Sequence, residues 1–235
     1  MSPEEFRAQL EYDLDWRMKE LALLTNQLSN ISEEDKKIYC KALLVMLYSH
    51  FEGFCKEAFK TYVRLINEEK IIRSKATEYI VASSLGEEFH DIQYHKNIGN
   101  NCCDIFNISS NETKFKKYFI RAHFIRMFDQ ILDQEIDISE RITEKIVDTK
   151  SNLTLDVLSN ILYRLGLPYN QFDAHEGLIT TLLTRRGAYA HGNKVEGISE
   201  KDYKIIEKKV FDIISALVTL LTESAKNRSY LKVVF

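Results

Sequence analysis

The sequence predicts an all-α protein, and three observations support that prediction. The 235 residues contain only 2 prolines and 8 glycines, so few positions interrupt a helix. Apolar residues recur at intervals of three and four along much of the chain. Helix-starting serines precede three of these stretches, at Ser2, Ser32 and Ser199. With 45% hydrophobic residues, the chain suffices for one domain with a substantial core, or for two small ones.

The first predicted helix begins after Ser2 and runs to about Gln27. Ser2 suits the N-cap, Pro3 suits the first turn, and the acidic residues that follow favour the positive end of the helix dipole. Trp16 and Arg17 lie near the middle of this helix. The simplest interpretation of this pair is a packed indole beside an exposed cation.

The second predicted helix is the longest and spans about residues 33–69. Its centre, residues 42–51, is apolar nearly all round, which indicates a buried central helix. Glu52 follows directly, and a carboxylate inside such a helix needs a partner. Two interpretations are open: the helix turns towards solvent at Glu52, or Glu52 pairs with Arg186 further along the chain.

The stretch from about 71 to 150 is less regular. Residues 74–84 suit a short helix, and the polar residues 86–112 suggest a loop-rich segment. Residues 113–132 form a helix in which cations and aromatics interleave; this pattern suits either RNA contact or an amphipathic helix with solvated lysines. Residues 133–148 are charged and suit a short helix or a linker.

Three helices complete the chain. A compact helix over residues 154–165 ends at Gly166, and a motif-bearing helix leads to His191 and Gly192. The last helix covers about residues 200–226, and the β-prone tail that follows it suits docking on the domain or on a partner.

The motif-bearing helix contains an arginine in an unusual place. Leu178, Ile179, Leu182 and Leu183 form one apolar stripe, and continuing the helix at about 100° per residue puts Arg186 near the centre of that stripe. A charge there is costly unless it is paired or faces a functional cleft. His191 follows five residues later, directly before a glycine that ends the helix.

An arginine and a histidine together suit phosphodiester cleavage of RNA without a metal. The imidazole of His191 can take up and return protons at neutral pH, activating the ribose 2′-hydroxyl or protonating the leaving oxygen. The guanidinium of Arg186 can hold the scissile phosphate with paired hydrogen bonds. Tyr189 or Asn193 can add a hydrogen bond to the phosphate or sugar.

The helix geometry limits how these two residues act. Side chains five residues apart on an ideal helix point about 140° apart, so Arg186 and His191 of one straight helix do not converge on one phosphate. Either the helix loosens before Gly192, or a second copy of the chain contributes to the site.

Several classes of protein lack support in this sequence. The net charge of −3 gives no overall basic surface, and no apolar run approaches a membrane span, so we expect a cytoplasmic protein without membrane contact. The four cysteines (Cys40, Cys55, Cys102 and Cys103) lack metal-ligand spacing and are expected to be free thiols. His90 and His95 are expected to be exposed loop residues. No nucleotide-binding or metalloprotease motif occurs, and we expect no metal and no cofactor.

The stretch Arg186-Gly-Ala-Tyr-Ala-His191-Gly-Asn193 resembles the R-x4-6-H motif of HEPN domains (higher eukaryotes and prokaryotes nucleotide-binding). Residues 47–54, Leu-Tyr-Ser-His-Phe-Glu-Gly-Phe, are similar to the "Tyr…Trp-Glu-Gly-Phe" helix of one prokaryotic branch. Residues 16–20 and 165–167 also sit where that branch has similar residues. One position departs from the pattern, because Gly187 follows the arginine where active members commonly have a polar residue.

The resemblance implies an up-and-down helical bundle, a single domain over residues 1–235 with a loop-rich helical insertion at about 71–150, and dimerisation through the motif helix. It implies a metal-independent endoribonuclease of a toxin–antitoxin or antiphage system, with RNA as substrate and an antitoxin or defence protein as partner. Arg186 and His191 would be catalytic, supported by Glu52 and, nearby, by Arg185, Tyr189 and Asn193.

Two alternatives are kept beside the ribonuclease. One is a non-catalytic HEPN dimer that binds a nucleotide or a protein, since some members of the superfamily are such modules. The other is a structural bundle in which Arg186 merely pairs with Glu52.

Overall fold

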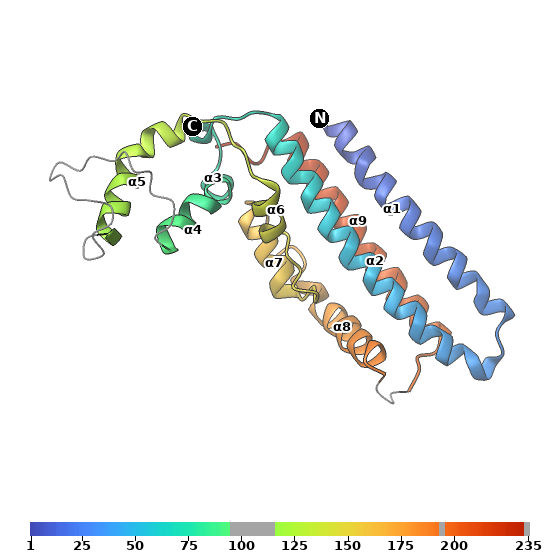
Figure 1. Ribbon diagram of the computed structural model, residues 1–235. Helices are drawn as coiled ribbons and strands as arrows, with labels where there is room; N and C mark the ends of the chain where they lie inside the picture. The colour runs from blue at the N-terminus through green and yellow to red at the C-terminus, as the bar shows by residue number, and fades with distance from the viewer. Residues whose placement is uncertain (95–115, 193–195, 233–235) are drawn as a thin grey trace.

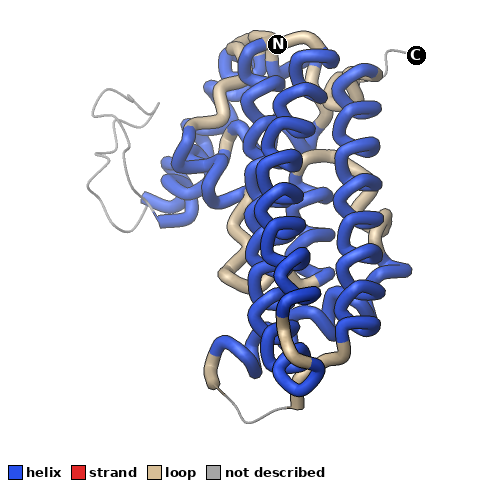
Figure 2. The backbone as a smooth tube through the Cα atoms, turned by 90° about the vertical axis from the view of Figure 1, so that its right-hand side faces the viewer, coloured by secondary structure: helices blue, strands red, loops and turns tan. Residues whose placement is uncertain are grey.

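The computed structural model describes residues 1–94, 116–192 and 196–232. Three long helices run side by side through the molecule: α1 (Pro3–Asn26), α2 (Glu33–Glu68) and α9 (Glu200–Lys226) (Figure 1). α1 and α2 are antiparallel and are joined by a short 3-10 turn, η1 (Gln27–Asn30). α8 (Glu176–Ala190) packs on α2. The prediction of an all-α bundle is confirmed, and the tube in Figure 2 shows no strand in the described residues.

The predicted helix starts are confirmed because each rests on a local cap. The Ser2 hydroxyl accepts a hydrogen bond from the Glu5 amide, and the Glu5 carboxylate accepts one from the Ser2 amide. The hydroxyls of Ser32 and Ser199 accept in the same way from the amides three residues on. These caps satisfy amides that have no partner within the helix, which fixes where α1, α2 and α9 begin.

The core is centred on α2. Large side chains along this helix are fully buried by the helices around it: Leu44, Tyr48, Phe51, Phe54, Phe59, Tyr62 and Ile66. Cys40 and Cys55 are buried free thiols, as expected, whereas Cys102 and Cys103 lie outside the described residues. Because α2 is covered on several sides, polar groups along it must find partners within the protein.

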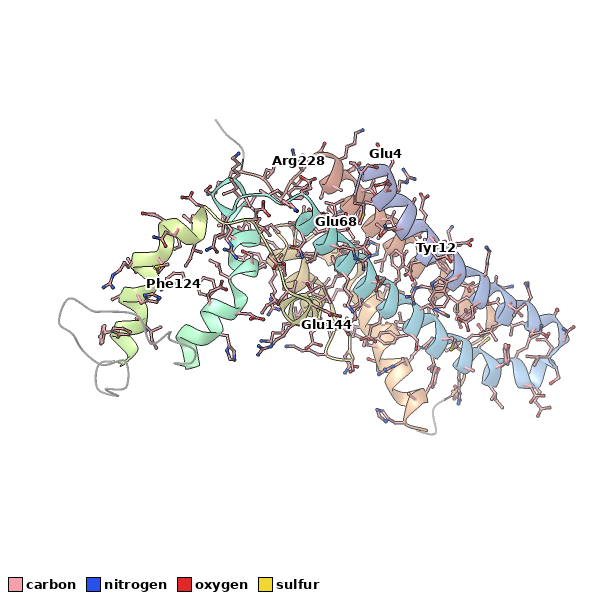
Figure 3. The ribbon with its side chains drawn as sticks, turned by 45° about the horizontal axis from the view of Figure 1, so that its top comes forward. Glu4, Tyr12, Glu68, Phe124, Glu144 and Arg228 are labelled. Atoms are coloured by element: carbon pink, nitrogen blue, oxygen red, sulfur yellow. The ribbon has the colours of Figure 1, made fainter. Side chains whose placement is uncertain are left out.

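The region between α2 and α7 (Leu155–Arg164) is more helical than predicted. η2 (Arg73–Lys75) and α3 (Glu78–Ser84) are followed by α4 (Gly86–Tyr94), where the polar sequence predicted a loop. The prediction was wrong for residues 86–94 because α4 has an apolar side, with Phe89 packed against Phe124 of α5 (Lys116–Leu132). α4 and α5 extend away from the long helices, and Phe124 marks their contact (Figure 3).

Two polar connections hold the ends of this region to the bundle. The Glu144 carboxylate of α6 (Glu140–Ile146) forms ion pairs with Lys56 and Lys60 of α2 (Figure 3). At the C-terminal end, Glu69 accepts hydrogen bonds from Arg228 and Tyr230. The tail then forms an antiparallel β-bridge between Leu231 and Ala76, so its described part docks on the domain as expected.

Candidate functional site

Arg186 lies on the side of α8 that faces α2. Ile179 and Leu182 of the same helix are buried, and Arg186 follows them by one further turn. Its guanidinium carbon is 4.9 Å from the ring centroid of Tyr48 on α2. This distance is that of a cation–π contact, in which the cation lies over the face of the aromatic ring. The predicted position of Arg186 on the apolar stripe therefore corresponds to a half-buried cation on an aromatic ring.

Tyr48 is fully buried, and its hydroxyl is tied to another part of the chain. The backbone amide of Leu153, in the segment between α6 and α7, donates a hydrogen bond of 2.7 Å to the phenol oxygen. Burial raises the pKa of Tyr48 to about 12, and the negative charge of Glu52 acts in the same direction. The phenol is therefore neutral at physiological pH and does not act as a base.

Glu52 lies one helical turn after Tyr48 and is half-buried. Within the described parts of the chain, Arg186 forms no ion pair, with Glu52 or with any other carboxylate. The interpretation in which Glu52 pairs directly with Arg186 is therefore wrong. The ring of Tyr48 contacts the guanidinium instead, and the negative charge of Glu52 helps to raise the pKa of the Tyr48 phenol.

His191 caps the end of α8 and is exposed to solvent. Its amide donates a hydrogen bond of 3.1 Å to the Gly187 carbonyl, and Gly192 follows with φ of 69°, a left-handed conformation that suits glycine. The predicted helix stop at Gly192 is confirmed. Because α8 is helical without a break through Ala190, it does not loosen early to bring His191 beside Arg186.

The other three supporting residues have different surroundings. The Tyr189 hydroxyl donates a hydrogen bond of 3.2 Å to the Glu196 carbonyl, and the Lys41 ammonium lies 5.5 Å from the Tyr189 ring centroid. Tyr189 thus links α8 to α2 and to the segment that follows α8. Arg185 is half-buried and forms no ion pair with the residues that the structure describes. Asn193 lies outside those residues.

Gly187 has open space where a side chain would project. A Cβ atom placed on it meets nothing within 4 Å beyond its chain neighbours and the nearby backbone of its own helix, so packing inside this chain does not require glycine there. Glycine in a helix costs about 1 kcal/mol relative to alanine. A helix face with this opening allows a second backbone to approach closely.

A second arginine site lies on the side of α2 that faces α1. Arg17 donates two hydrogen bonds to the Asp13 carboxylate, of 2.8 and 3.2 Å, and lies over the Trp16 ring at 4.4 Å. Its side chain is only 12% exposed, whereas Trp16 is 43% exposed. The expectation of a packed indole beside an exposed cation was wrong. Gly53 of α2 explains the reversal, since a Cβ there would lie 2.7 Å from the Arg17 Nη1.

His50 completes this second site. Its Nε2 lies 3.2 Å from a carboxylate oxygen of Glu20, and its ring stacks edge-on against Trp16. Burial lowers the pKa of His50, with Arg17 acting in the same direction and Glu20 against it. The α1–α2 interface therefore brings together the Arg17–Asp13 ion pair, the Trp16 ring and the His50 ring.

Sequence reasoning missed the role of Tyr48. The signal was available, because a tyrosine in the middle of a buried helix needs a partner for its hydroxyl. The partner, the Leu153 amide, is 105 positions away in the chain, and no local pattern connects the two.

No metal-binding cluster and no membrane-spanning helix are found among the described residues. No group of three or more histidine, cysteine, aspartate or glutamate side chains is placed to hold a metal ion there. None of the helices described is long and apolar enough to cross a membrane. His90 lies on α4 rather than in a loop, and His95 falls outside the described residues.

Comparison with known proteins supports the resemblance to HEPN domains and the helical bundle. The family model described as RiboL-PSP-HEPN matches residues 12–223, which is most of the chain. The chain belongs to the RiboL-PSP-HEPN family. The match includes α2, α8, most of α9 and both arginine sites. No curated protein and no solved structure matches the chain significantly. Membership of RiboL-PSP-HEPN supports a HEPN-type nuclease or an RNA-related module.

Proposed function

We propose that the protein is a metal-independent endoribonuclease whose active site forms between two copies of the chain. The observation that supports this most directly is Arg186, a half-buried guanidinium that stacks on Tyr48 and forms no ion pair with the described residues. Its hydrogen-bonding edges are therefore not engaged by a carboxylate. A phosphodiester can supply the missing negative charge and accept paired hydrogen bonds from those edges.

The second copy follows from the geometry of α8. The helix is unbroken between Arg186 and His191, so the two side chains project about 140° apart. A two-fold arrangement of two α8 helices would place His191 of a second copy beside Arg186 of the first. The open space at Gly187 supports a close approach of the two helices.

The cleavage step uses groups that this site would contain. One His191 imidazole takes the proton of the ribose 2′-hydroxyl while the 2′-oxygen attacks phosphorus, and the bond from phosphorus to the 5′-oxygen breaks. The leaving 5′-oxygen takes a proton from solvent water, and the imidazolium later returns its proton to the solvent. Arg186 neutralises charge that develops on the non-bridging oxygens. The products are a 2′,3′-cyclic phosphate and a 5′-hydroxyl, so DNA would not react.

The test is cleavage of RNA in excess EDTA by the wild type and by Arg186→Ala and His191→Ala. We expect each variant to lose at least about 100-fold in rate, the lower end of what general acid–base catalysis contributes. His175→Ala, at the opposite end of α8, is the matched control and keeps the wild-type rate. Retained cleavage in both variants would contradict the proposal, as would equal cleavage of an all-deoxy substrate.

A non-catalytic RNA- or nucleotide-binding dimer is the second candidate, and Gly187 favours it because active relatives commonly have a polar residue there. Under this alternative the protein cuts no RNA, while a nucleotide raises the melting temperature of the wild type but not of Arg186→Ala.

The proposed setting is a toxin–antitoxin or antiphage system. Expression of the wild type is then expected to stop bacterial growth, while His191→Ala permits growth at the same protein level. An antitoxin or defence protein is the expected partner, and it would restore growth when co-expressed with the wild type.

A further inference from the structure

We propose that Tyr48 is a positioning residue, which holds the Arg186 guanidinium by its face so that the edges stay free for the substrate. This inference rests on the proposed function, in which Arg186 binds the scissile phosphate. It assigns to Glu52 an indirect role, through the tyrosine rather than through the arginine.

The first step is the shape of the contact. The guanidinium carbon lies 4.9 Å from the Tyr48 ring centroid, and the ring is fully buried. A guanidinium has five N–H donors in its plane and none on its face. A guanidinium that presents its face to a ring is therefore restrained in orientation without using a donor. A direct ion pair with Glu52 would engage the donors that a phosphate needs.

The second step is what keeps the ring in place. The phenol oxygen accepts the Leu153 amide hydrogen at 2.7 Å, which leaves its own proton to point elsewhere. Glu52 lies one turn further along α2, and its negative charge acts with burial to raise the pKa of this phenol. The bond from the Leu153 amide limits how far the ring can tilt, and the ring in turn limits where Arg186 can lie.

The third step concerns the segment that supplies Leu153. Thr149 and Leu153 are buried, whereas Lys150, Ser151 and Asn152 between them are exposed. Lys150 and Ser151 both have positive φ, of 52° and 58°, which is costly for residues other than glycine. The hydrogen bond from Leu153 thus connects the Tyr48 ring, which contacts Arg186, to this tightly turned segment. The position of the guanidinium therefore depends on the ring and on the segment.

The test compares Tyr48→Phe, which keeps the ring, with Tyr48→Leu, which removes it. We expect Tyr48→Leu to lower kcat for RNA cleavage by about 10- to 100-fold with KM little changed, as displacement of a reacting group does. Tyr48→Phe keeps the ring but loses the bond from the Leu153 amide, so we expect a smaller fall in kcat, of less than about 10-fold. Tyr62→Phe is the matched control, because Tyr62 is also fully buried on α2 and its hydroxyl has no hydrogen-bond partner among the described residues.

A second readout does not depend on activity. In NMR spectra, the Arg186 side-chain protons over the Tyr48 ring are expected to be shifted upfield by the ring current in wild type and in Tyr48→Phe. In Tyr48→Leu they return to ordinary values. If Tyr48→Leu does not fold, Arg186→Lys serves instead: it leaves the core intact, keeps the charge and lacks the flat face, and we expect the same loss in kcat.

The outcomes separate the two proposals. If Tyr48→Leu, or Arg186→Lys in its place, keeps the wild-type kcat while only the melting temperature changes, Tyr48 is structural and the inference is wrong. Absence of the ring-current shift in the wild type would also overturn it. If the wild type cuts no RNA yet the shift is present, the proposed function fails while the contact between Tyr48 and Arg186 stands.

Discussion

Two arginine sites lie on different sides of α2, and they differ in how the charge is compensated. Arg17 stacks on Trp16 and donates two hydrogen bonds to Asp13, so both its face and its edge are used. Arg186 stacks on Tyr48 and forms no ion pair with the described residues. Both sites contain a ring and a nearby glycine, but only one leaves donors free. The contrast supports the proposal that Arg186, unlike Arg17, is available to a ligand.

Replacing each arginine by alanine gives the largest expected difference. Arg17→Ala removes the partner of a mostly buried Asp13 and is expected to lower the free energy of unfolding by about 1–3 kcal/mol, with the cleavage rate of the folded protein unchanged. Arg186→Ala is expected to change stability by less than about 1 kcal/mol, the size of a partly exposed cation–π contact. We nevertheless expect the Arg186→Ala variant to lose RNA cleavage.

Urea unfolding and RNA cleavage on the same preparations measure this pair. The distinction between the two arginines would be contradicted if Arg17→Ala lost cleavage at unchanged stability. It would also be contradicted if Arg186→Ala were destabilised as much as Arg17→Ala.

The glycines beside the two arginines, Gly53 and Gly187, are expected to respond in opposite ways to substitution by alanine. Gly53→Ala would bring a methyl group to 2.7 Å from the Arg17 Nη1, and because Asp13 holds that guanidinium we expect a loss of about 1–3 kcal/mol. Gly187→Ala has open space and is expected to stabilise a single chain by up to about 1 kcal/mol, the difference in helix propensity. Thermal unfolding at low protein concentration measures both, and equal signs would refute the expectation.

A concentration series adds a test of the dimer. If a second α8 approaches Gly187, then Gly187→Ala weakens self-association even as it stabilises the chain, which sedimentation velocity detects. Unchanged self-association would place the contact elsewhere.

The smallest expected effect is the pH dependence of the α1–α2 site. Burial lowers the pKa of His50 below its ordinary value near 6.5, so the folded chain binds fewer protons than the unfolded chain at acidic pH. The associated stability is fully present above about pH 6.5 and is lost as the pH falls through the lower pKa of the folded state. The free energy of unfolding of wild type should fall more steeply from pH 7.5 to 5 than that of His50→Gln. Parallel curves would show that His50 does not contribute.

The long helices could be predicted from the sequence, and the reason is local. Ser2, Ser32 and Ser199 set the helix starts, Gly166 and Gly192 the ends, and each acts within a few residues. The segment 86–94 was missed because its helix depends on packing against α5, which is distant in the sequence.

The candidate site was predicted less completely, because its partners are set by tertiary packing. Periodicity placed Arg186 on the inner side of α8 but did not distinguish Tyr48 from Glu52, one turn apart, as its partner. Likewise, adjacent Trp16 and Arg17 could not be assigned as buried or exposed without knowing that Gly53 leaves room for the guanidinium. The dimer remains a prediction.

Complementation between two inactive variants tests the central claim most directly. Arg186→Ala and His191→Ala chains carrying different affinity tags are co-expressed, and the mixed dimer is purified through both tags. It retains one Arg186 and one His191, on different chains. If the site combines Arg186 of one copy with His191 of the other, the mixed dimer cleaves RNA although both parent dimers are inactive. A mixed dimer as inactive as its parents, beside an active wild type, would contradict the account.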